Sequence, residues 1–258
     1  MMIVGIIPAR FASTRLMGKP LADIGGKPMI QRTYESAKKS KLLDEIVIAV
    51  DDQKVYEVVK KFGAKVVLTP SDIKTGSDRI AFVAKQLKEA DIVVNIQGDE
   101  PFIEGRMIDE AIEPHLFDKH VKVSTLAKRI VSVEEFKSPS VVKVVFDYNN
   151  YALYFSRSPI PHVRDAKTNL ERVQSGEIYK HVGLYVFRKD FLFKFTALKP
   201  TDLEQIEKLE QLRILENGFP IKIVVTEFES FSVDTPQDLE FIRTYYERNI
   251  NSKQRSKK

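Results

Sequence analysis

The sequence has 258 residues, 43% of them hydrophobic, and a formal net charge of +5 at pH 7. A chain of this size can bury the core of one large α/β domain, which we expect over residues 1–250. The absence of cysteine excludes disulfides, thiolate catalysis and cysteine-bound zinc, and four scattered histidines leave little for a histidine metal site. Any metal would therefore have oxygen ligands.

Most of the net positive charge lies at the end of the chain. Residues 251–258, NSKQRSKK, carry +4, so we expect a basic disordered tail rather than a basic face for nucleic acid. No segment approaches the roughly 18 uninterrupted apolar residues of a membrane helix, and the apolar start is too short for a signal peptide. We therefore expect a cytoplasmic protein with no nucleic-acid or membrane partner.

Hydrophobic, β-branched segments predict eight strands, and segments with helical periodicity alternate with several of them. The predicted strands are 1–8, 44–52, 64–70, 91–100, 121–127, 141–146, 181–188 and 221–228. The predicted helices are 27–39, 51–63, 79–90, 106–117, 204–218 and 235–249. This alternation predicts an α/β fold with a mostly parallel sheet, helices on both faces and a strand-rich excursion over residues 120–195. Ligands of such sheets bind beyond the carboxyl ends of the strands.

The loop after the first strand, RFASTRLMGKPLADIGGKPM, combines basic and small polar residues. Arg10, Arg15 and Lys19, with Ser13, Thr14, Gly18 and backbone N–H groups, would suit a polyphosphate. The loop matches neither the Walker pattern nor the G-x-G-x-x-G turn of dinucleotide-binding proteins. A solvated basic loop is the alternative.

Two acidic segments are candidates for binding a divalent cation. In NIQGDEP, residues 95–101, Gly98 permits a turn that would place Asp99 and Glu100 at a strand end, where Mg2+ bridging phosphates could bind. An exposed Gly-Asp turn is the alternative. In SVDTPQDL, residues 232–239, Asp234 precedes a helix start and would serve either as a cap or as a second metal ligand.

A second set of polar residues lies in otherwise apolar surroundings. His181 and Tyr185 are four residues apart in a predicted strand, so they share a face and could line a pocket, although a hydrogen-bonded core histidine is the commoner outcome. Glu210 and Gln211 would, on pattern alone, lie on the solvated side of an amphipathic helix.

Taken together, the motifs resemble one family. IIPARFASTRLMGKPL, GGKPMI, TGSDRI, NIQGDEP, SRSPIP, KHVGLY, EKLEQLRILENG and SVDTPQDL occur in the order found in 3-deoxy-manno-octulosonate cytidylyltransferases, also called CMP-Kdo synthetases. The resemblance covers the chain except its basic tail. The opening loop is shared with other sugar nucleotidyltransferases, whereas SRSPIP, KHxGLY and LEQLRxLE are more specific.

The resemblance implies a Rossmann-like nucleotidyltransferase that transfers CMP from CTP to 3-deoxy-D-manno-octulosonate (Kdo) for lipopolysaccharide biosynthesis. It further implies Mg2+ as cofactor, a homodimer, and metal ligation by Asp99 and Asp234, which with Lys19 form the catalytic set. The implied nucleotide-binding residues are Pro8, Ala9, Arg10, Ser13, Arg15, Lys19, Thr75, Gly76, Ser77, Asp78, Arg79 and Gln97. The implied sugar-binding residues are Gln97, Arg157, His181, Tyr185, Glu210 and Gln211, with Arg157 pairing with the carboxylate of Kdo.

The sequence departs from the family pattern at two places. Met17 stands where proline is usual, and Ile73-Lys74 replaces a common His-Pro pair, which removes any contact that the histidine makes. Another sugar nucleotidyltransferase and a non-catalytic nucleotide- or nucleic-acid-binding protein remain the alternative functions.

Overall fold

The structure is a computed structural model that describes residues 1–12 and 16–255, and the chain divides into two compact units. The first unit contains Met1–Ile108 and Glu229–Lys258, and the second contains Asp109–Phe228. The expectation of one domain over residues 1–250 stays a prediction. Composition did not reveal the boundary because helix α4, Gly105–Phe117, runs through it without a linker.

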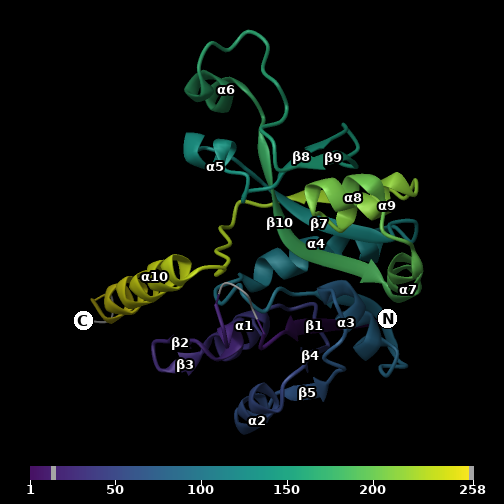
Figure 1. The fold of residues 1–258 in the computed structure, drawn as a ribbon, viewed down its shortest axis with the longest axis vertical. Helices are drawn as coiled ribbons and strands as arrows, with labels where there is room; N and C mark the ends of the chain where they lie inside the picture. The colour runs from purple at the N-terminus through teal and green to yellow at the C-terminus, as the bar shows by residue number, and fades with distance from the viewer. Residues whose placement is uncertain (13–15, 256–258) are drawn as a thin grey trace. The chain divides into compact units, whose positions relative to one another are not determined.

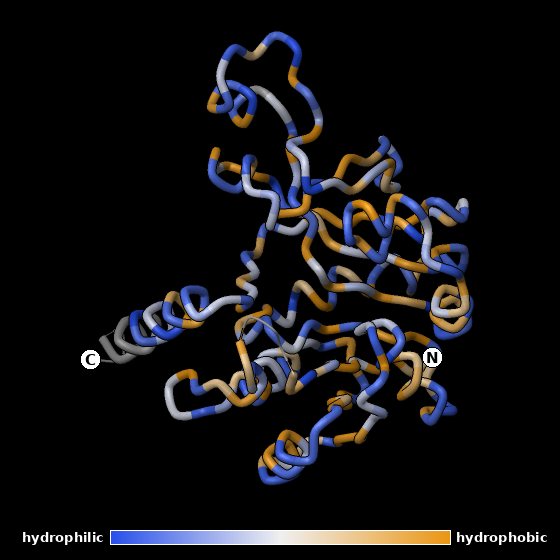
Figure 2. Tube along the Cα trace, viewed as in Figure 1, coloured by the Kyte–Doolittle hydropathy of each residue, from blue (hydrophilic) through white to orange (hydrophobic). Residues whose placement is uncertain are grey.

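The first unit is built on a parallel sheet (Figure 1). Its strands are β1 (Met2–Ala9), β4 (Glu45–Val50), β5 (Lys65–Leu68) and β6 (Ala90–Asn95), in the order β6-β1-β4-β5. Residues 3–7 of β1 and 92–95 of β6 are buried, which explains their continuous rather than alternating hydrophobicity. Figure 2 shows hydrophobic residues concentrated along these strand segments.

Local capping determines where the helices of this unit begin and end. α2 (Gln53–Lys61) begins at Asp52, whose side chain accepts from the Lys54 N–H, and is followed by Gly63 at φ 78°. α3 (Gly76–Ala84) begins three residues before the predicted start because Thr75 caps it. α1 spans Met29–Ala37, after the short elements η1 (Lys19–Leu21), β2 (Asp23–Ile24) and β3 (Lys27–Pro28).

The C-terminal helix α10, Pro236–Arg255, packs against the β2 segment of the same unit. The Arg32 guanidinium lies 4.2 Å from the centroid of the Tyr246 ring and donates to the Tyr246 hydroxyl at 2.7 Å. The backbone of residues 251–255, the first part of the predicted disordered tail, is helical. The segment contains no glycine or proline to end the helix, and the disorder of the basic tail stays a prediction.

The second unit contains a mixed sheet. β7 (Val123–Arg129) pairs in parallel with β11 (Lys222–Val225) and antiparallel with β10 (Tyr179–Arg188). β8 (Lys143–Phe146) pairs antiparallel with both β10 and β9 (Ala152–Ser156). The helices of this unit are α5 (Val133–Lys137), α6 (Asn169–Ser175), α7 (Lys189–Ala197), α8 (Asp202–Glu207) and α9 (Gln211–Glu216).

Each of the eight predicted strands is a strand in the structure, whereas β9, α5, α6 and α7 were not predicted. The helix predicted over 204–218 is wrong in one respect, because Lys208 adopts φ 55° and separates α8 from α9. Helical periodicity continues across this turn, so the pattern concealed the break. Within the described part of the chain, no helix combines the length and hydropathy needed to cross a membrane.

His115, a buried residue of α4, makes stability depend on pH. Burial, together with the nearby charge of Arg188, lowers the pKa of His115 to about 4. The unfolded chain, with a histidine pKa of about 6.5, binds the extra proton first, so stability is lost as the pH falls from 6.5 through 4. We expect His115→Gln to reduce the loss of unfolding free energy between pH 7 and pH 5 by about 2 kcal/mol.

Urea unfolding at both pH values measures this effect. His120→Gln, at an exposed position of the same unit, is the matched control and should retain the pH dependence of the unsubstituted protein. An unchanged dependence in His115→Gln would contradict the prediction.

Candidate active site

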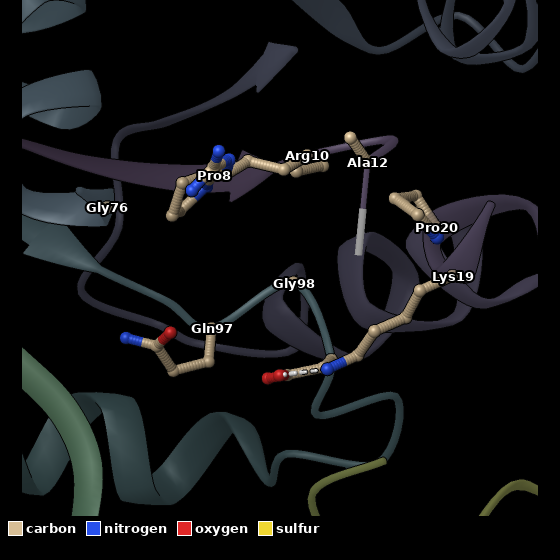
Figure 3. Close-up of a pocket in the computed structure, with 10 residues that line it drawn as sticks. Pro8, Arg10, Ala12, Lys19, Pro20, Gly76, Gln97 and Gly98 are labelled. Carbon is tan, nitrogen blue, oxygen red and sulfur yellow. Dashed lines mark hydrogen bonds and ion pairs between the residues drawn. The ribbon is translucent and has the colours of Figure 1, made fainter. Parts of the chain in front are cut away.

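A pocket of about 410 Å³ lies in the first unit, beyond the carboxyl ends of β1 and β6 (Figure 3). Figure 3 shows Pro8 and Arg10 on one side of this space and Gln97 and Lys19 on the other. The lining residues are Pro8, Ala9, Arg10, Ala12, Lys19, Pro20, Gly76, Gln97, Gly98 and Asp99. The pocket therefore lies where a parallel sheet is expected to bind its ligand.

Gly98 allows the two strand ends to approach each other at the floor of this pocket. A Cβ atom at position 98 would lie 2.6 Å from the backbone oxygen of Pro8. Any larger residue would force the two backbones apart. The glycine thus brings Gln97 and Asp99 beside the end of β1.

Lys19 bridges two carboxylates at the edge of the pocket. Its Nζ donates to Asp99 Oδ2 at 2.6 Å and to Asp234 Oδ1 at 2.9 Å. Burial acts to lower the pKa of Lys19, but the charges and hydrogen bonds of the two aspartates outweigh it and raise that pKa above its ordinary value. Lys19 is therefore an ammonium at neutral pH, and its side chain is only 13% exposed, so the alternative of a solvated basic loop does not hold for this residue.

The segment before α10 brings Asp234 close to Asp99, although the two residues are far apart in the sequence. The Val233 N–H donates to the Asp99 carbonyl at 3.0 Å, and Ser230 Oγ donates to Glu100 Oε2 at 2.7 Å. The cap of α10 is Thr235, whose Oγ1 accepts from the Asp238 N–H. Asp234 is therefore not the residue that caps this helix, and its carboxylate faces Lys19.

Glu100 differs from its neighbour Asp99 in its surroundings. Its side chain is buried, and this burial raises its pKa to about 7, although the Ser230 hydrogen bond opposes the shift. Glu100 therefore binds the Ser230 side chain and does not line the pocket with Asp99.

The Asp99–Asp234 pair fits a hard divalent cation. One oxygen from each carboxylate already converges on a single positive charge, and carboxylate oxygens are the ligands that Mg2+ prefers. Within residues 1–12 and 16–255, no group of three or more acidic, histidine or cysteine side chains forms a fuller metal cage. Mg2+ in proteins is usually held by one or two carboxylates, and water and phosphate oxygens complete its coordination.

Asp51, at the carboxyl end of β4, organises the opposite side of the pocket and was missed by the sequence analysis. Its carboxylate accepts from the Phe11 N–H at 2.9 Å and from Arg79 at 3.2 Å, and it lies 3.7 Å from Arg10 Nε. Two consecutive aspartates after a buried strand were the available signal. Arg10 also donates to the Lys74 carbonyl at 2.9 Å, a backbone contact that does not depend on the side chain at position 74.

The predicted nucleotide-binding segment 75–79 makes mainly structural contacts. Thr75 and Asp78 form the cap of α3, and Gly76 lines the pocket. Arg79 is fully buried and donates to Thr69 Oγ1, Asp51 and the Ile73 carbonyl. The Arg79 side chain has no accessible surface in this structure, and its contact with the nucleotide stays a prediction. Ser13 and Arg15 lie outside the described residues.

His181 and Tyr185 of the second unit share one face of β10, as predicted. Their ring centroids are 5.3 Å apart, and His181 Nε2 lies 2.9 Å from Thr125 Oγ1. Burial lowers the pKa of His181 to about 3, so the ring is neutral. Burial and the charge of Glu210 raise the pKa of Tyr185, whose buried hydroxyl has no hydrogen-bond partner among the described residues.

Glu210 and Gln211 lie at the turn between α8 and α9, not on a solvated helix face. Gln211 is buried and begins α9, and Glu210 precedes it. Glu210 also lines a cavity of about 260 Å³ whose other lining residues are Glu204, Gln205, Lys208 and Leu209. The broken helix thus places both side chains at an inward-facing turn.

Arg157 holds this turn through backbone carbonyls. Its guanidinium donates to the carbonyls of Glu207 at 2.7 Å, Pro139 at 3.0 Å and Lys208 at 3.4 Å. The pairing of Arg157 with a sugar carboxylate, which the resemblance implies, stays a prediction. Its described contacts make it a support for the Glu210–Gln211 turn.

Comparison with known proteins decides the family. Residues 4–227 match the family described as Cytidylyltransferase. The chain is 54% identical over 244 residues to the 3-deoxy-manno-octulosonate cytidylyltransferase of Geobacter metallireducens, covering 93% of this chain and 96% of the relative. It is 53% identical over 257 residues to the enzyme of that name from Pelobacter propionicus, covering 98% and 100%. The chain belongs to the 3-deoxy-manno-octulosonate cytidylyltransferase family.

A solved structure agrees with this membership in the cytidylyltransferase family. The structure of a CMP:2-keto-3-deoxy-manno-octonic acid synthetase complexed with CTP superposes with a TM-score of 0.89 at 40% identity, covering 96% of this chain and 100% of that one. A thymidylyltransferase structure from Bacillus anthracis, only 18% identical with a TM-score of 0.65, shares the fold alone. The predicted α/β nucleotidyltransferase fold is thus confirmed for this cytidylyltransferase.

Proposed function

We propose that this cytidylyltransferase transfers CMP from CTP to the anomeric 2-hydroxyl of Kdo, releasing pyrophosphate. The observation that carries the proposal is the pocket in which Lys19, Asp99 and Asp234 converge beyond the strand ends, in a chain whose relatives bear this activity in their names. The hydroxyl would attack the α-phosphorus in line, and no covalent enzyme intermediate is needed.

The chain's own residues would act chiefly by binding and by neutralising charge. Arg10 and Lys19 line the pocket and supply positive charge for the β- and γ-phosphates, which favours departure of pyrophosphate. Gly76 and Gly98 let the nucleotide approach the backbone closely. Holding both reactants in place then accounts for much of the rate enhancement.

Mg2+ is part of this proposal, with Asp99 and Asp234 as the residues that would hold it. When bound, the cation would offset negative charge at the α-phosphate and make the sugar hydroxyl more acidic. The neutral His181, whose pKa burial lowers to about 3, would be a weak base, so the proposal assigns activation of the hydroxyl to the cation rather than to this histidine.

The sugar acid is proposed to contact the second unit. The buried Tyr185 hydroxyl, protonated at all working pH values, would donate to a sugar oxygen, and Glu210 and Gln211 would accept from or donate to its other hydroxyls. Gln97, which lines the pocket of the first unit, is proposed to contact both substrates.

We further propose a cytoplasmic homodimer that supplies CMP-Kdo for lipopolysaccharide biosynthesis. Large exposed hydrophobic side chains of the second unit support dimerisation: Tyr148 in the β8–β9 turn, Leu153 on β9 and Ile206 on α8 are each more than 60% exposed. Sedimentation equilibrium of the protein and of a Leu153→Glu variant tests this, and a monomer at all concentrations would contradict it.

Pyrophosphate release tests the proposed reaction. The protein is incubated with Mg2+ and CTP in the presence of Kdo, sialic acid or no acceptor, and UTP replaces CTP in a parallel series. We expect release only with CTP and Kdo together. Release with sialic acid alone would indicate another sugar-acid cytidylyltransferase, and no release with any acceptor would indicate a binding protein.

A further inference from the structure

A single ammonium group occupies the space between the two carboxylates assigned to the metal. Lys19 Nζ contacts Asp99 Oδ2 and Asp234 Oδ1 at 2.6 and 2.9 Å, which are direct, charge-assisted hydrogen bonds. A cation that used the same two oxygens would have to lie close to the present position of Nζ. Two positive charges a few ångströms apart repel each other, so both cannot occupy this place.

We propose that Lys19 and a divalent cation are alternative occupants of the Asp99–Asp234 pair, so that Lys19 leaves the pair when the cation binds and then points to the nucleotide phosphates. The inference rests on the proposed function in one respect, the assignment of the two aspartates to the metal. It adds a second role to Lys19, that of an internal counter-ion in the metal-free enzyme.

The backbone at Lys19 is held in place, while its side chain has space to move. Lys19 begins the short helix η1, where the Leu21 N–H donates to the Gly18 carbonyl at 2.8 Å and Pro20 is buried. Lys19 also lines the pocket of about 410 Å³, into which its four-carbon chain can rotate. Movement of the side chain therefore needs no change in the fold.

The exchange would couple the binding of metal and nucleotide. Because the cation binds only to the fraction of molecules in which Lys19 has left the pair, its apparent affinity for the free enzyme is reduced by that fraction. CTP phosphates attract the ammonium and would increase that fraction. The free enzyme would therefore bind a divalent cation weakly, and the cation would bind well once nucleotide is present.

Substitution of Lys19 should consequently raise the affinity for a divalent cation and lower the affinity for CTP. Lys19→Met keeps the aliphatic stem but removes the charge. We expect this variant to bind Mn2+ at least tenfold more tightly than the unsubstituted protein in the absence of nucleotide, and to bind CTP at least tenfold more weakly. A general loss of structure would weaken both, so the opposite signs distinguish the exchange from damage to the fold.

Electron paramagnetic resonance of free Mn2+, titrated with nucleotide-free protein, measures the first effect. Lys27→Met is the matched control, because Lys27 pairs with Glu35 at 2.7 Å and lies outside the pocket lining. This control should bind Mn2+ as the unsubstituted protein does, and adding Asp234→Asn to Lys19→Met should abolish the tighter binding. Equal or weaker Mn2+ binding by Lys19→Met would overturn the proposal.

A second measurement uses the unsubstituted protein and does not depend on the folding of a variant. Acetic anhydride labelling, read by mass spectrometry, should modify Lys19 several-fold faster after Mg2+ is added, with Lys27 as the internal reference. An unchanged rate would also overturn the proposal. Neither measurement includes Kdo, so failure of the exchange leaves pyrophosphate release unaffected, and failure of the proposed reaction leaves these titrations interpretable.

Discussion

Replacing Asp99 by asparagine is expected to lower turnover by about 100- to 1,000-fold, the usual cost of losing one group that offsets charge in the transition state. The substitution removes the negative charge that Asp99 contributes to Lys19 and to the proposed cation, while an amide of the same shape remains. Asp99 is partly exposed, with 26% of its side chain accessible, so the folded state should lose little stability.

Pyrophosphate release at saturating CTP, Kdo and Mg2+ gives the turnover, and urea unfolding gives the stability. Asp91→Asn is the matched control, since Asp91 is 57% exposed, accepts from the Met2 N–H and does not line the pocket. Its turnover should equal that of the unsubstituted enzyme. Near-normal turnover of Asp99→Asn at saturating Mg2+ would exclude Asp99 as a metal ligand.

Replacing Glu204 by glutamine is expected to reduce the free energy of unfolding by about 3 kcal/mol, because it leaves the charge of a buried partner uncompensated. Arg213 Nε donates to Glu204 Oε2 at 2.7 Å, and both residues are 8% exposed. The same carboxylate accepts from the Thr201 N–H at the start of α8. The pair therefore joins α8 to α9 on either side of the Glu210–Gln211 turn.

Urea unfolding followed by circular dichroism measures this loss. Glu240→Gln is the control, because Glu240 pairs with Arg243 on the surface and is 72% exposed, so its removal should change stability by at most about 1 kcal/mol. If the turn binds Kdo, as proposed, Glu204→Gln should also raise the KM for Kdo more than the KM for CTP. Equal stability of the two variants would show that the buried pair contributes nothing.

Much of the parallel half of the fold could be predicted from hydrophobic pattern alone. β1, β4 and β6 are continuous apolar runs because both faces of each strand are largely buried. The β9 segment, ALYFS, was not predicted, because its exposed Leu153 breaks the continuous or alternating pattern on which strand prediction depends.

Arg79 and Arg157 make contacts in the structure that their motifs did not indicate. The motifs imply that both residues contact ligands, and this stays a prediction. In the structure, Arg79 is directed to Asp51 and Thr69, and Arg157 to carbonyls of the 207–208 turn. The sequence motif is the same whether the guanidinium of its arginine donates to a ligand or to backbone carbonyls. Only the positions of the neighbouring residues in the folded chain distinguish these two roles.

The sequence by itself determined the fold class, the strand ends at which polar residues gather, and the candidate groups for binding phosphate and a cation. These properties follow from local pattern, because burial, capping and chemical type are encoded within a few residues. Only the tertiary structure decided that Lys19 joins Asp99 to Asp234, that Glu100 turns away into the core, and that Asp51 supports the pocket. Asp99 and Asp234 are 135 positions apart in the sequence, and the hydrogen bond from Val233 to Asp99, made only when the chain folds, places the second carboxylate beside the first.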